Sequence, residues 1–500
     1  MTAAELDVTP QVDDPVTTDP PPGTTRAHDG SPWWATPPRW LRWTVLIALV
    51  AIAIGIRSAF LHVETMDYQA FLSRWYDTLS GQGFAAFAER FADYNYPYLY
   101  LIWGLTVLHV PSLIGIKALS IVFDVVLAFF AYRIVGLRTR QFWLRALAFG
   151  IVVLLPSVIA NSAYWGQADA IYSAFALGGV YFLMRAQRES LRRNSIWACV
   201  LFGLAISFKL QAVFVLPVLV WLLVCRRLPW YALLAIPAVY LLLDIPAVLA
   251  GASWSTALSV YLDQTDSYQQ LTLGAANLYQ LIPIEGDATW LAHLGIAAAA
   301  AVIAVFLGWS WWRTRPARPR SADSLADTVV TPTSILVVAT ASAVIVPFLL
   351  PAMHDRYFYT AEVLTVVSAF YLPLRFVVIP ILVQAAAIGV YHASLTGDQG
   401  HGLGGHGAGP GAGVQQPGAQ GSGAQGPGAQ RPGGPGPGNH PGGAPAGGGP
   451  HGGSSGYTSG RGDTALAVYA SMIGVAAVGM VAALVDTFRR ARSRLSPSSD

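Results

Sequence analysis

Long uncharged apolar segments recur along most of this chain, and short polar or charged stretches separate them. A bilayer-spanning helix needs about 20 apolar residues, because no water is present in the membrane core to satisfy its backbone. The pattern therefore predicts an all-α polytopic membrane protein with about twelve transmembrane helices. The fifth and sixth of these are short, and tilted, broken and hairpin arrangements stay open for them. The expected helices cover residues 42–61, 114–136, 143–160, 169–186, 195–209, 211–224, 230–250, 291–312, 333–351, 357–373, 376–394 and 464–487.

The composition excludes a soluble globular protein. Hydrophobic residues make up 54% of the 500 positions, charged residues only 11%, and the mean hydropathy is +0.48; such values are typical of membrane proteins. The net charge of +3 indicates no nucleic-acid partner, because the arginines are spread over many loops. The two cysteines, Cys199 and Cys225, indicate neither a disulfide framework nor a zinc site.

The arginines predict the orientation of the chain. If the N-terminus lies in the cytoplasm, 22 of the 30 basic residues fall on the cytoplasmic side, in agreement with the positive-inside rule. Both termini are then cytoplasmic. This arrangement requires that residues 98–110 do not cross the membrane, so we expect an interfacial helix there. The alternative is a short true span at this place, with the other spans shifted in register.

Two segments have compositions that cannot form a packed core. One is rich in Pro, Thr and Asp, and the other is dominated by Gly, Pro, Ala, Gln and His. Neither can bury enough apolar surface to offset the conformational entropy lost on ordering. The expected organisation is a disordered cytoplasmic tail at 1–38, a transmembrane core at 39–394 with external loops at 62–113 and 251–290, a flexible external loop at 395–463, a last transmembrane helix at 464–487 and a basic cytoplasmic tail at 488–500.

Polar residues gather on the expected external face. Lys117 and Lys209 are the only two lysines, and the predicted orientation puts both on the face opposite most of the arginines. Charges at the outer ends of transmembrane helices are costly unless they face a wet cavity or each other. We therefore expect a site for a polar ligand on this face. The polar clusters that would form it are Glu64–Asp67, Tyr94–Pro97, Tyr164–Asp169 and His354–Tyr357.

Two groups of polar residues suggest particular roles. Trp165, Gln167 and Asp169 offer an aromatic face, an amide and a carboxylate close together, a combination that suits a sugar. Lys117 and Asp124 lie seven residues apart on one face of the second expected helix. They are expected either to form a structural ion pair or to contribute to the external site. A purely structural role stays open for both groups.

Five short motifs occur in order within residues 42–394. As an ordered set they resemble motifs of the bacterial relatives of the PIG-V mannosyltransferases. The Tyr-Asn-Tyr-Pro-Tyr stretch departs mildly from the family, which more usually has a double proline there. The resemblance does not cover the Gly/Pro-rich loop or the last expected helix. The motifs are Asp67-Tyr68 with Phe71 and Trp75, Asp93-Tyr94-Asn95-Tyr96-Pro97-Tyr98, Tyr164-Trp165-Gly166-Gln167-Ala168-Asp169, Lys209-Leu210-Gln211 and Met353-His354-Asp355-Arg356-Tyr357-Phe358.

The resemblance implies a fold and a reaction. The family belongs to the GT-C class of integral-membrane glycosyltransferases, which use lipid-phosphate sugars. A GT-C-type helical bundle with interfacial helices in the first external loop is therefore expected. An acidic residue of that loop would act as the base on an acceptor hydroxyl, which implies Asp67, with Glu64 as the nearest rival. The sugar, mannose by resemblance, would leave a polyprenyl-phosphate donor with inversion.

The resemblance also implies how the substrates are bound. The leaving lipid phosphate would need a cation beside it, for which Lys117, Lys209 and Arg356 are the candidates. The donor's hydrocarbon tail would lie in a groove between transmembrane helices. The residues expected to contact the sugar, the acceptor or the phosphate are Asn95, Tyr96, Trp165, Gln167, Asp169, Gln211, His354, Asp355 and Tyr357.

Several alternatives stay open. Glu64, Asp67 and Asp93 share one loop, so a divalent metal stays open as a cofactor, although their spacing defines no metal site. The donor sugar could instead be glucose or arabinofuranose, and the sequence does not separate these sugars. A secondary transporter or a lipid flippase would also place charges within the membrane. A structural membrane protein is the third class.

The ratio of Arg to Lys is very high, and Ala and Gly are abundant, which indicates a GC-rich bacterial genome. The expected location is the bacterial inner membrane, with the site facing outward. A cell-envelope lipid or glycan would then be the acceptor. Protein partners are not indicated by the sequence.

Overall fold

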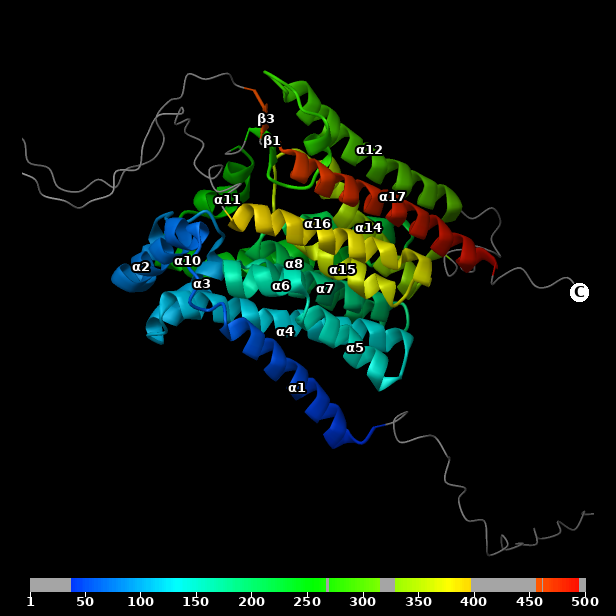
Figure 1. Ribbon diagram of the computed structural model, residues 1–500, viewed down its shortest axis with the longest axis horizontal. Coiled ribbons are helices and arrows are strands. Elements are labelled where there is room, and N and C mark those ends of the chain that lie inside the picture. Colours follow the sequence, from blue (N-terminus) through cyan, green and yellow to red (C-terminus); the bar gives the residue numbers. More distant parts are fainter. Residues whose placement is uncertain (1–36, 267–268, 315–328, 397–455, 461, 494–500) are drawn as a thin grey trace, which may run out of the picture.

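The computed structural model describes residues 37–266, 269–314, 329–396, 456–460 and 462–493. Within these residues almost all regular structure is helical (Figure 1), as expected for the all-α membrane class. The tail expected at 1–38 and the flexible loop expected at 395–463 lie almost wholly outside the described residues. The same holds for the end of the basic tail, residues 494–500.

The helices and strands are defined here by their residues. Short helical turns extend or connect several of the α-helices, and they are η1 (Tyr68–Leu72), η2 (Gly83–Ala88), η3 (Ala160–Trp165), η4 (Leu210–Val215), η5 (Trp230–Leu234), η6 (Leu278–Leu281) and η7 (Leu374–Val377). The strands are β1 (Gln270–Leu273), β2 (Met353–His354) and β3 (Thr458–Gly460). The α-helices are α1 (Arg39–Ser58), α2 (Ser73–Gln82), α3 (Tyr96–Val107), α4 (Ser112–Arg138), α5 (Phe142–Val153), α6 (Pro156–Ile159), α7 (Asp169–Ala186), α8 (Leu191–Phe208), α9 (Pro217–Val224), α10 (Ala235–Ala250), α11 (Trp254–Asp266), α12 (Thr289–Thr314), α14 (Pro332–Leu349), α15 (Tyr359–Ala369), α16 (Val378–Leu395) and α17 (Thr464–Ser493).

In the described part of the chain, seven helical segments are long and apolar enough to cross a membrane. A bent pair, 142–153 with 156–165, raises the number to eight if it forms one span. The expected count of about twelve is therefore not confirmed. The other four expected spans fall on α7, α8, η4 with α9, and α15, which are shorter or more polar. Almost every residue of α7 is buried, so its polar side chains face protein rather than lipid.

The centre of the bundle is α7. It packs against α8, α4, α14 and α15, and these helices share one large apolar core. Two helices with largely open apolar faces are α1 and α12, of which only 11% and 22% of the apolar window is buried. Figure 1 shows both at the edges of the bundle. Apolar faces left open in this way suit contact with lipid.

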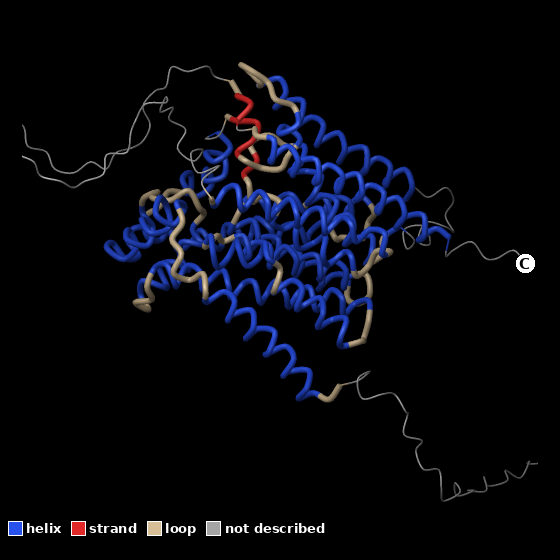
Figure 2. Tube along the Cα trace, viewed as in Figure 1, coloured by secondary structure: helices blue, strands red, loops and turns tan. Residues whose placement is uncertain are grey.

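A small three-stranded parallel sheet lies at one end of the bundle, with strand order β2-β1-β3 (Figure 2). Thr272 pairs with Met353, and Gln270 pairs with Thr458. The sheet was not expected from the sequence, since each strand has only two to four residues. It joins the second external segment, the loop between α14 and α15, and the end of the predicted Gly/Pro-rich loop.

The first external segment forms its own apolar cluster. Trp75 of α2, Phe87 of η2 and Tyr98 of α3 are buried in this cluster together with Ala247 of α10. With 12 residues, α3 is shorter than the roughly 20 needed to cross a bilayer. Most of residues 98–110, which are expected not to cross, fall on this helix.

The arginine-rich loops meet at the opposite end of the bundle from the sheet. Arg138 donates to the carbonyl of Phe370 at 2.7 Å, and Arg375 pairs with Asp486 at 2.6 Å. Because α17 begins just after β3 and runs 30 residues to this end, it connects the two ends of the molecule. Figure 1 shows α1 beginning and α17 ending on the same side.

Candidate functional site

A cavity of about 650 Å³ opens at the end of the bundle that carries the sheet. Its walls come from the first external segment, the turn before α7, the junction of α8 with η4, and the loop between α14 and α15. Segments far apart in the sequence thus meet at one place. The residues expected from the sequence that line this cavity are Asp67, Asn95, Gln167, Lys209, Gln211, His354, Arg356 and Tyr357.

The buried carboxylate of Asp67 is held from three directions. Its Oδ2 atom accepts hydrogen bonds from Trp165 Nε1 at 3.0 Å, Gln167 Nε2 at 2.6 Å and Arg356 Nη1 at 3.0 Å. Within the described residues its second oxygen, Oδ1, accepts no hydrogen bond. These three donors fix the orientation of the carboxylate and leave one oxygen available to a ligand.

The turn between η3 and α7 depends on a glycine. Gly166 has a φ of 80°, in the left-handed region that favours glycine. The carbonyl of Trp165 accepts from Thr65 Oγ1 at 3.1 Å, and the carbonyl of Gln167 accepts from Ser120 Oγ at 2.6 Å. The turn is thereby fixed to the first external segment and to α4, and it holds the two side chains that bind Asp67.

A second carboxylate, Asp169, stands at the first position of α7. Its Oδ1 forms an ion pair with Lys209, and its Oδ2 accepts from Asn161 Nδ2 at 2.9 Å. The Nε atom of Arg356 lies 3.8 Å from the same Oδ2. Acidic and basic groups therefore alternate in the order Asp67, Arg356, Asp169 and Lys209. We call these four residues the charge cluster.

Aromatic rings surround the two cations of the charge cluster. The guanidinium of Arg356 lies 5.2 Å from the centre of the Trp165 ring, and Lys209 Nζ lies 5.4 Å from that of Tyr94. Both distances fall within the range of cation–π attraction. Buried ion pairs need such additional partners to offset the loss of hydration. The charges of the cluster thus have compensating partners, and they border a cavity where a ligand can compete for them.

His354 and Asp355 sit beside this cluster. Burial in the first place, and then the positive charges of Arg356 and Lys209, lower the pKa of His354 to about 3. Its imidazole is therefore neutral at ordinary pH. Asp355 accepts a hydrogen bond from Ser394 at 2.6 Å and lies 3.8 Å from Arg356. This carboxylate helps to orient Arg356 from the side of α16.

Four expected site residues are close to this cavity without lining it. Trp165, Asp169 and Asp355 reach it through the contacts described above. Tyr96 is buried in the aromatic cluster of the first external segment, near Tyr100. Its position therefore indicates packing rather than ligand contact.

Two other expected residues point elsewhere. Glu64 is exposed and accepts a hydrogen bond from Gln69 at 3.1 Å. Lys117 Nζ donates to the carbonyls of Phe60 at 2.8 Å and Val63 at 2.6 Å, just after α1. The stem of Lys117 packs under Gly166, where an added Cβ would meet its Cγ at 3.5 Å. Lys117 thus stabilises the backbone around Phe60 and Val63 and packs against the turn at Gly166.

The ion pair considered for Lys117 and Asp124 is wrong. Seven residues of helix separate the two by roughly 10 Å along the axis, too far for contact. Asp124 Oδ2 instead lies 2.9 Å from Arg57 Nη2 of α1 and accepts from Ser162 Oγ at 2.5 Å. Both charged groups are fully buried. These contacts fix α1 and η3 to α4, close to the turn that leads into α7.

Like Tyr261, Tyr457 lines the cavity and was missed by the sequence analysis. It precedes β3 and lines the cavity. Its backbone is held by Thr289 Oγ1 at 2.9 Å and by the amide of Ala288 at 2.7 Å. The signal was present in the sequence, because Tyr457 is the only aromatic residue in the low-complexity stretch from 396 to 462.

Considering the described residues alone, no group of three or more His, Cys, Asp or Glu side chains could hold a metal ion. Glu64, Asp67 and Asp93, which share the first external loop, do not form such a group.

Comparison with known proteins gives no match. No protein-family model, curated protein or solved structure is significantly similar to this chain.

Proposed function

We propose that this protein is a membrane glycosyltransferase that acts at the external face. It moves a sugar, mannose, from a polyprenyl-phosphate donor to an acceptor hydroxyl. The observation that carries the proposal is the charge cluster at the wall of an aromatic and amide-lined cavity. It offers a carboxylate for an acceptor hydroxyl and two cations for a phosphate. These are the groups that inverting transfer from a lipid phosphate requires.

Arg356 and Lys209 are the proposed partners of the leaving phosphate. Both line the cavity, and both are paired with carboxylates in the absence of a ligand. A phosphate group is a stronger partner than a carboxylate, because it offers more charge and the guanidinium can bind it with two hydrogen bonds. Stabilisation of the developing charge in a site of low dielectric favours departure of the lipid phosphate.

Asp67 is the proposed base. Trp165 and Gln167 orient its carboxylate, and Oδ1 is the oxygen that would take the proton from the acceptor hydroxyl as that hydroxyl attacks the anomeric carbon. The bond to the lipid phosphate breaks as the new glycosidic bond forms, so the configuration at that carbon inverts. Glu64 is exposed and outside the cavity lining, which makes it the weaker candidate.

The proposed setting is the bacterial inner membrane, with a GT-C-type bundle in which α7, α8, α9 and α15 also cross. Both termini would be cytoplasmic and the cavity external. The clustering of arginine contacts at the end of the bundle opposite the sheet supports this orientation.

The test is a transfer assay in proteoliposomes holding the purified protein and extracted envelope lipids. Polyprenyl-phosphate mannose, glucose and arabinofuranose, each radiolabelled in the sugar, are supplied separately. The proposal predicts label in a new glycoside from the mannose donor. If only another donor gives a labelled glycoside, the transferred sugar is that one and not mannose. Label that crosses the bilayer without any new glycoside would overturn the enzyme proposal in favour of a transporter or flippase.

A further inference from the structure

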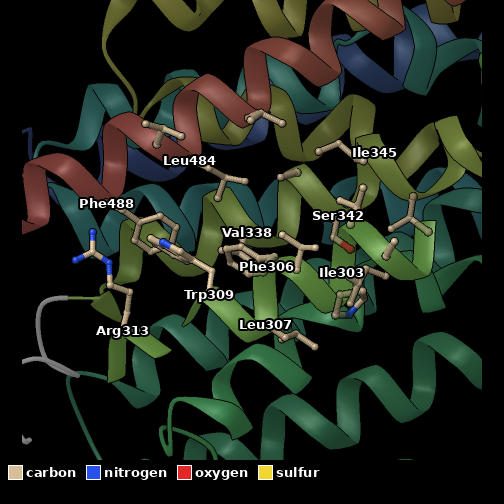
Figure 3. A pocket seen from close by; sticks show the side chains of 18 of the residues that line it. Ile303, Phe306, Leu307, Trp309, Arg313, Val338, Ser342, Ile345, Leu484 and Phe488 are labelled. Carbon is tan, nitrogen blue, oxygen red and sulfur yellow. The ribbon is translucent and has the colours of Figure 1, made fainter. Parts of the chain in front are cut away.

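A second cavity, of about 770 Å³, lies between α12, α14 and α17 in the half of the bundle away from the sheet (Figure 3). Its walls are almost wholly aliphatic and aromatic, and they include Ile303, Phe306, Val338 and Leu484. The one hydroxyl among them, that of Ser342, donates to the carbonyl of Phe214 at 2.6 Å. The interior therefore offers no group for a polar ligand and suits a hydrocarbon chain.

The cavity is open toward the bilayer. Val302 and Val305 on α12 are 45% and 72% exposed, and Val481 and Val485 on α17 are 50% and 42% exposed. These residues lie beside the cavity on helices that belong to the candidate spans. A lipid chain can thus enter from the side without passing through the protein.

One end of the cavity is cationic. Arg313 near the end of α12 and Arg489 on α17 belong to its lining, and both are exposed. In Figure 3 Arg313 lies beside Trp309 and Phe488, whereas Ser342 and Ile345 lie at the far side. The cavity therefore has the polarity of a lipid, with positive charge at one end and apolar walls along the rest.

Among the described residues, these two arginines differ from Arg375 and Arg490 in lacking a carboxylate partner. Arg375 and Arg490 both pair with Asp486, at 2.6 Å and 2.9 Å. Over the described ranges no carboxylate pairs with Arg313 or Arg489. Their charge is available to an anion at the membrane surface, where each arginine adds appreciably to the binding of anionic lipid.

We propose that this cavity binds an anionic glycerophospholipid of the leaflet next to the arginine-rich end. Its phosphate contacts Arg313 and Arg489, and one acyl chain occupies the apolar cavity. By the positive-inside rule this leaflet is the cytoplasmic one, which carries anionic lipid. Charge complementarity selects an anionic lipid over a zwitterionic one.

This lipid site is distinct from the charge cluster. On α12, Ile296 lines the first cavity and Arg313 lies at the end of the second. Seventeen residues of helix separate them by roughly 25 Å. A phosphate at Arg313 therefore cannot reach Arg356, and the inference does not depend on the proposed transferase activity.

The test is native mass spectrometry of the delipidated full-length protein with phosphatidylglycerol or phosphatidylcholine added back. The wild type is expected to prefer phosphatidylglycerol. Arg313→Gln with Arg489→Gln should weaken its binding about thirtyfold, since each arginine contributes roughly a factor of five. The matched control is Arg192→Gln with Arg193→Gln, two exposed arginines in the first turn of α8 at the same end, and it should keep full binding.

Two further variants keep the test decisive if the double glutamine variant fails to fold. Arg313→Lys with Arg489→Lys retains the charge and should retain most of the binding, whereas Ile303→Trp fills the cavity and should lose it. Equal binding of both lipids to the wild type would overturn the proposal. Equal loss in the control pair would do the same, and so would displacement of phosphatidylglycerol by an equimolar amount of polyprenyl phosphate.

Discussion

Arg356 holds two carboxylates at once. Its Nη1 donates to Asp67 at 3.0 Å, while its Nε lies 3.8 Å from Asp169. Asp169 in turn binds Lys209, so a change at any member alters the charge balance of the others. A ligand phosphate competes with these carboxylates for Arg356 and Lys209. The geometry of single side chains thus decides what the site can bind.

Replacing Arg356 by lysine should impair the proposed transfer although the charge is kept. One ammonium cannot reproduce the separate contacts to Asp67 and Asp169 or the planar fork for phosphate. We expect kcat/KM for the mannosyl donor to fall at least about tenfold. Arg74→Lys, at an exposed position of the same external segment, serves as the control and should keep the wild-type kcat/KM. An unimpaired Arg356→Lys variant would contradict the assignment.

His354 should make the fold sensitive to acid. Its pKa is about 3 in the folded protein and about 6.5 in an unfolded chain. Below pH 6.5 the unfolded chain therefore binds a proton at His354 that the folded protein does not bind. The free energy of unfolding falls as the pH drops from 6.5 toward 3. At pH 5 this amounts to about 2 kcal/mol. Chemical unfolding of His354→Asn at pH 7 and pH 5 should show a smaller loss than the wild type.

The exposed His392 provides the comparison for that experiment. His392→Asn should lose as much stability as the wild type between the two pH values. An acid sensitivity of His354→Asn equal to that of the wild type would show that this imidazole is not the group responsible.

Helix packing beneath the site depends on one buried ion pair. Arg57 of α1 and Asp124 of α4 are 1% and 0% exposed, and Asp124 also binds Ser162 of η3. Asp124→Asn leaves the guanidinium buried without a counter-charge, which should cost about 3 kcal/mol of unfolding free energy. Arg57→Met with Asp124→Leu removes both charges and should recover most of it. Chemical unfolding in detergent measures the free energy of unfolding of both variants. An equal loss in the single and the double variant would contradict the role of the ion pair.

Strand β3 holds the preceding residue, Tyr457, in the wall of the cavity. Gly460 in this strand has a φ of 78°, and an added Cβ would lie 2.1 Å from the carbonyl oxygen of Thr272. Gly460→Ala should therefore detach β3 from β1 and lower transfer, and Tyr457→Ala should lower it similarly. Gly462→Ala is the control, because its Cβ would meet only an ordinary contact at 3.6 Å. Full activity of Gly460→Ala would show that β3 is not needed.

Elements could be predicted from the sequence where a single periodic signal defines them. The long apolar helices, such as α12 and α17, follow directly from uncharged runs. The sheet could not, since β2 has two residues and pairs with β1 about eighty residues earlier in the chain. The roles of the two lysines could not be separated either. Lys209 and Lys117 look alike in sequence, and only tertiary packing sends one to the cavity and the other to backbone carbonyls.

The whole molecule has two chemically different ends. The end with the sheet carries the charge cluster and its cavity, and the other end carries the arginine contacts and the apolar cavity. Because α12 lines both cavities, lipid bound at one end contacts a helix that also borders the other. The arrangement fits a protein that works on lipid-linked substrates at one membrane face.

The most direct measurement compares transfer from polyprenyl-phosphate mannose by membranes holding the wild type, Asp67→Asn or Glu64→Gln at matched expression. Asparagine preserves the shape of Asp67 and removes the basic oxygen, so we predict a loss of about 10²-fold or more. Glu64→Gln should retain the wild-type rate. Undiminished transfer by Asp67→Asn would contradict the account, and loss in Glu64→Gln alone would move the base to Glu64.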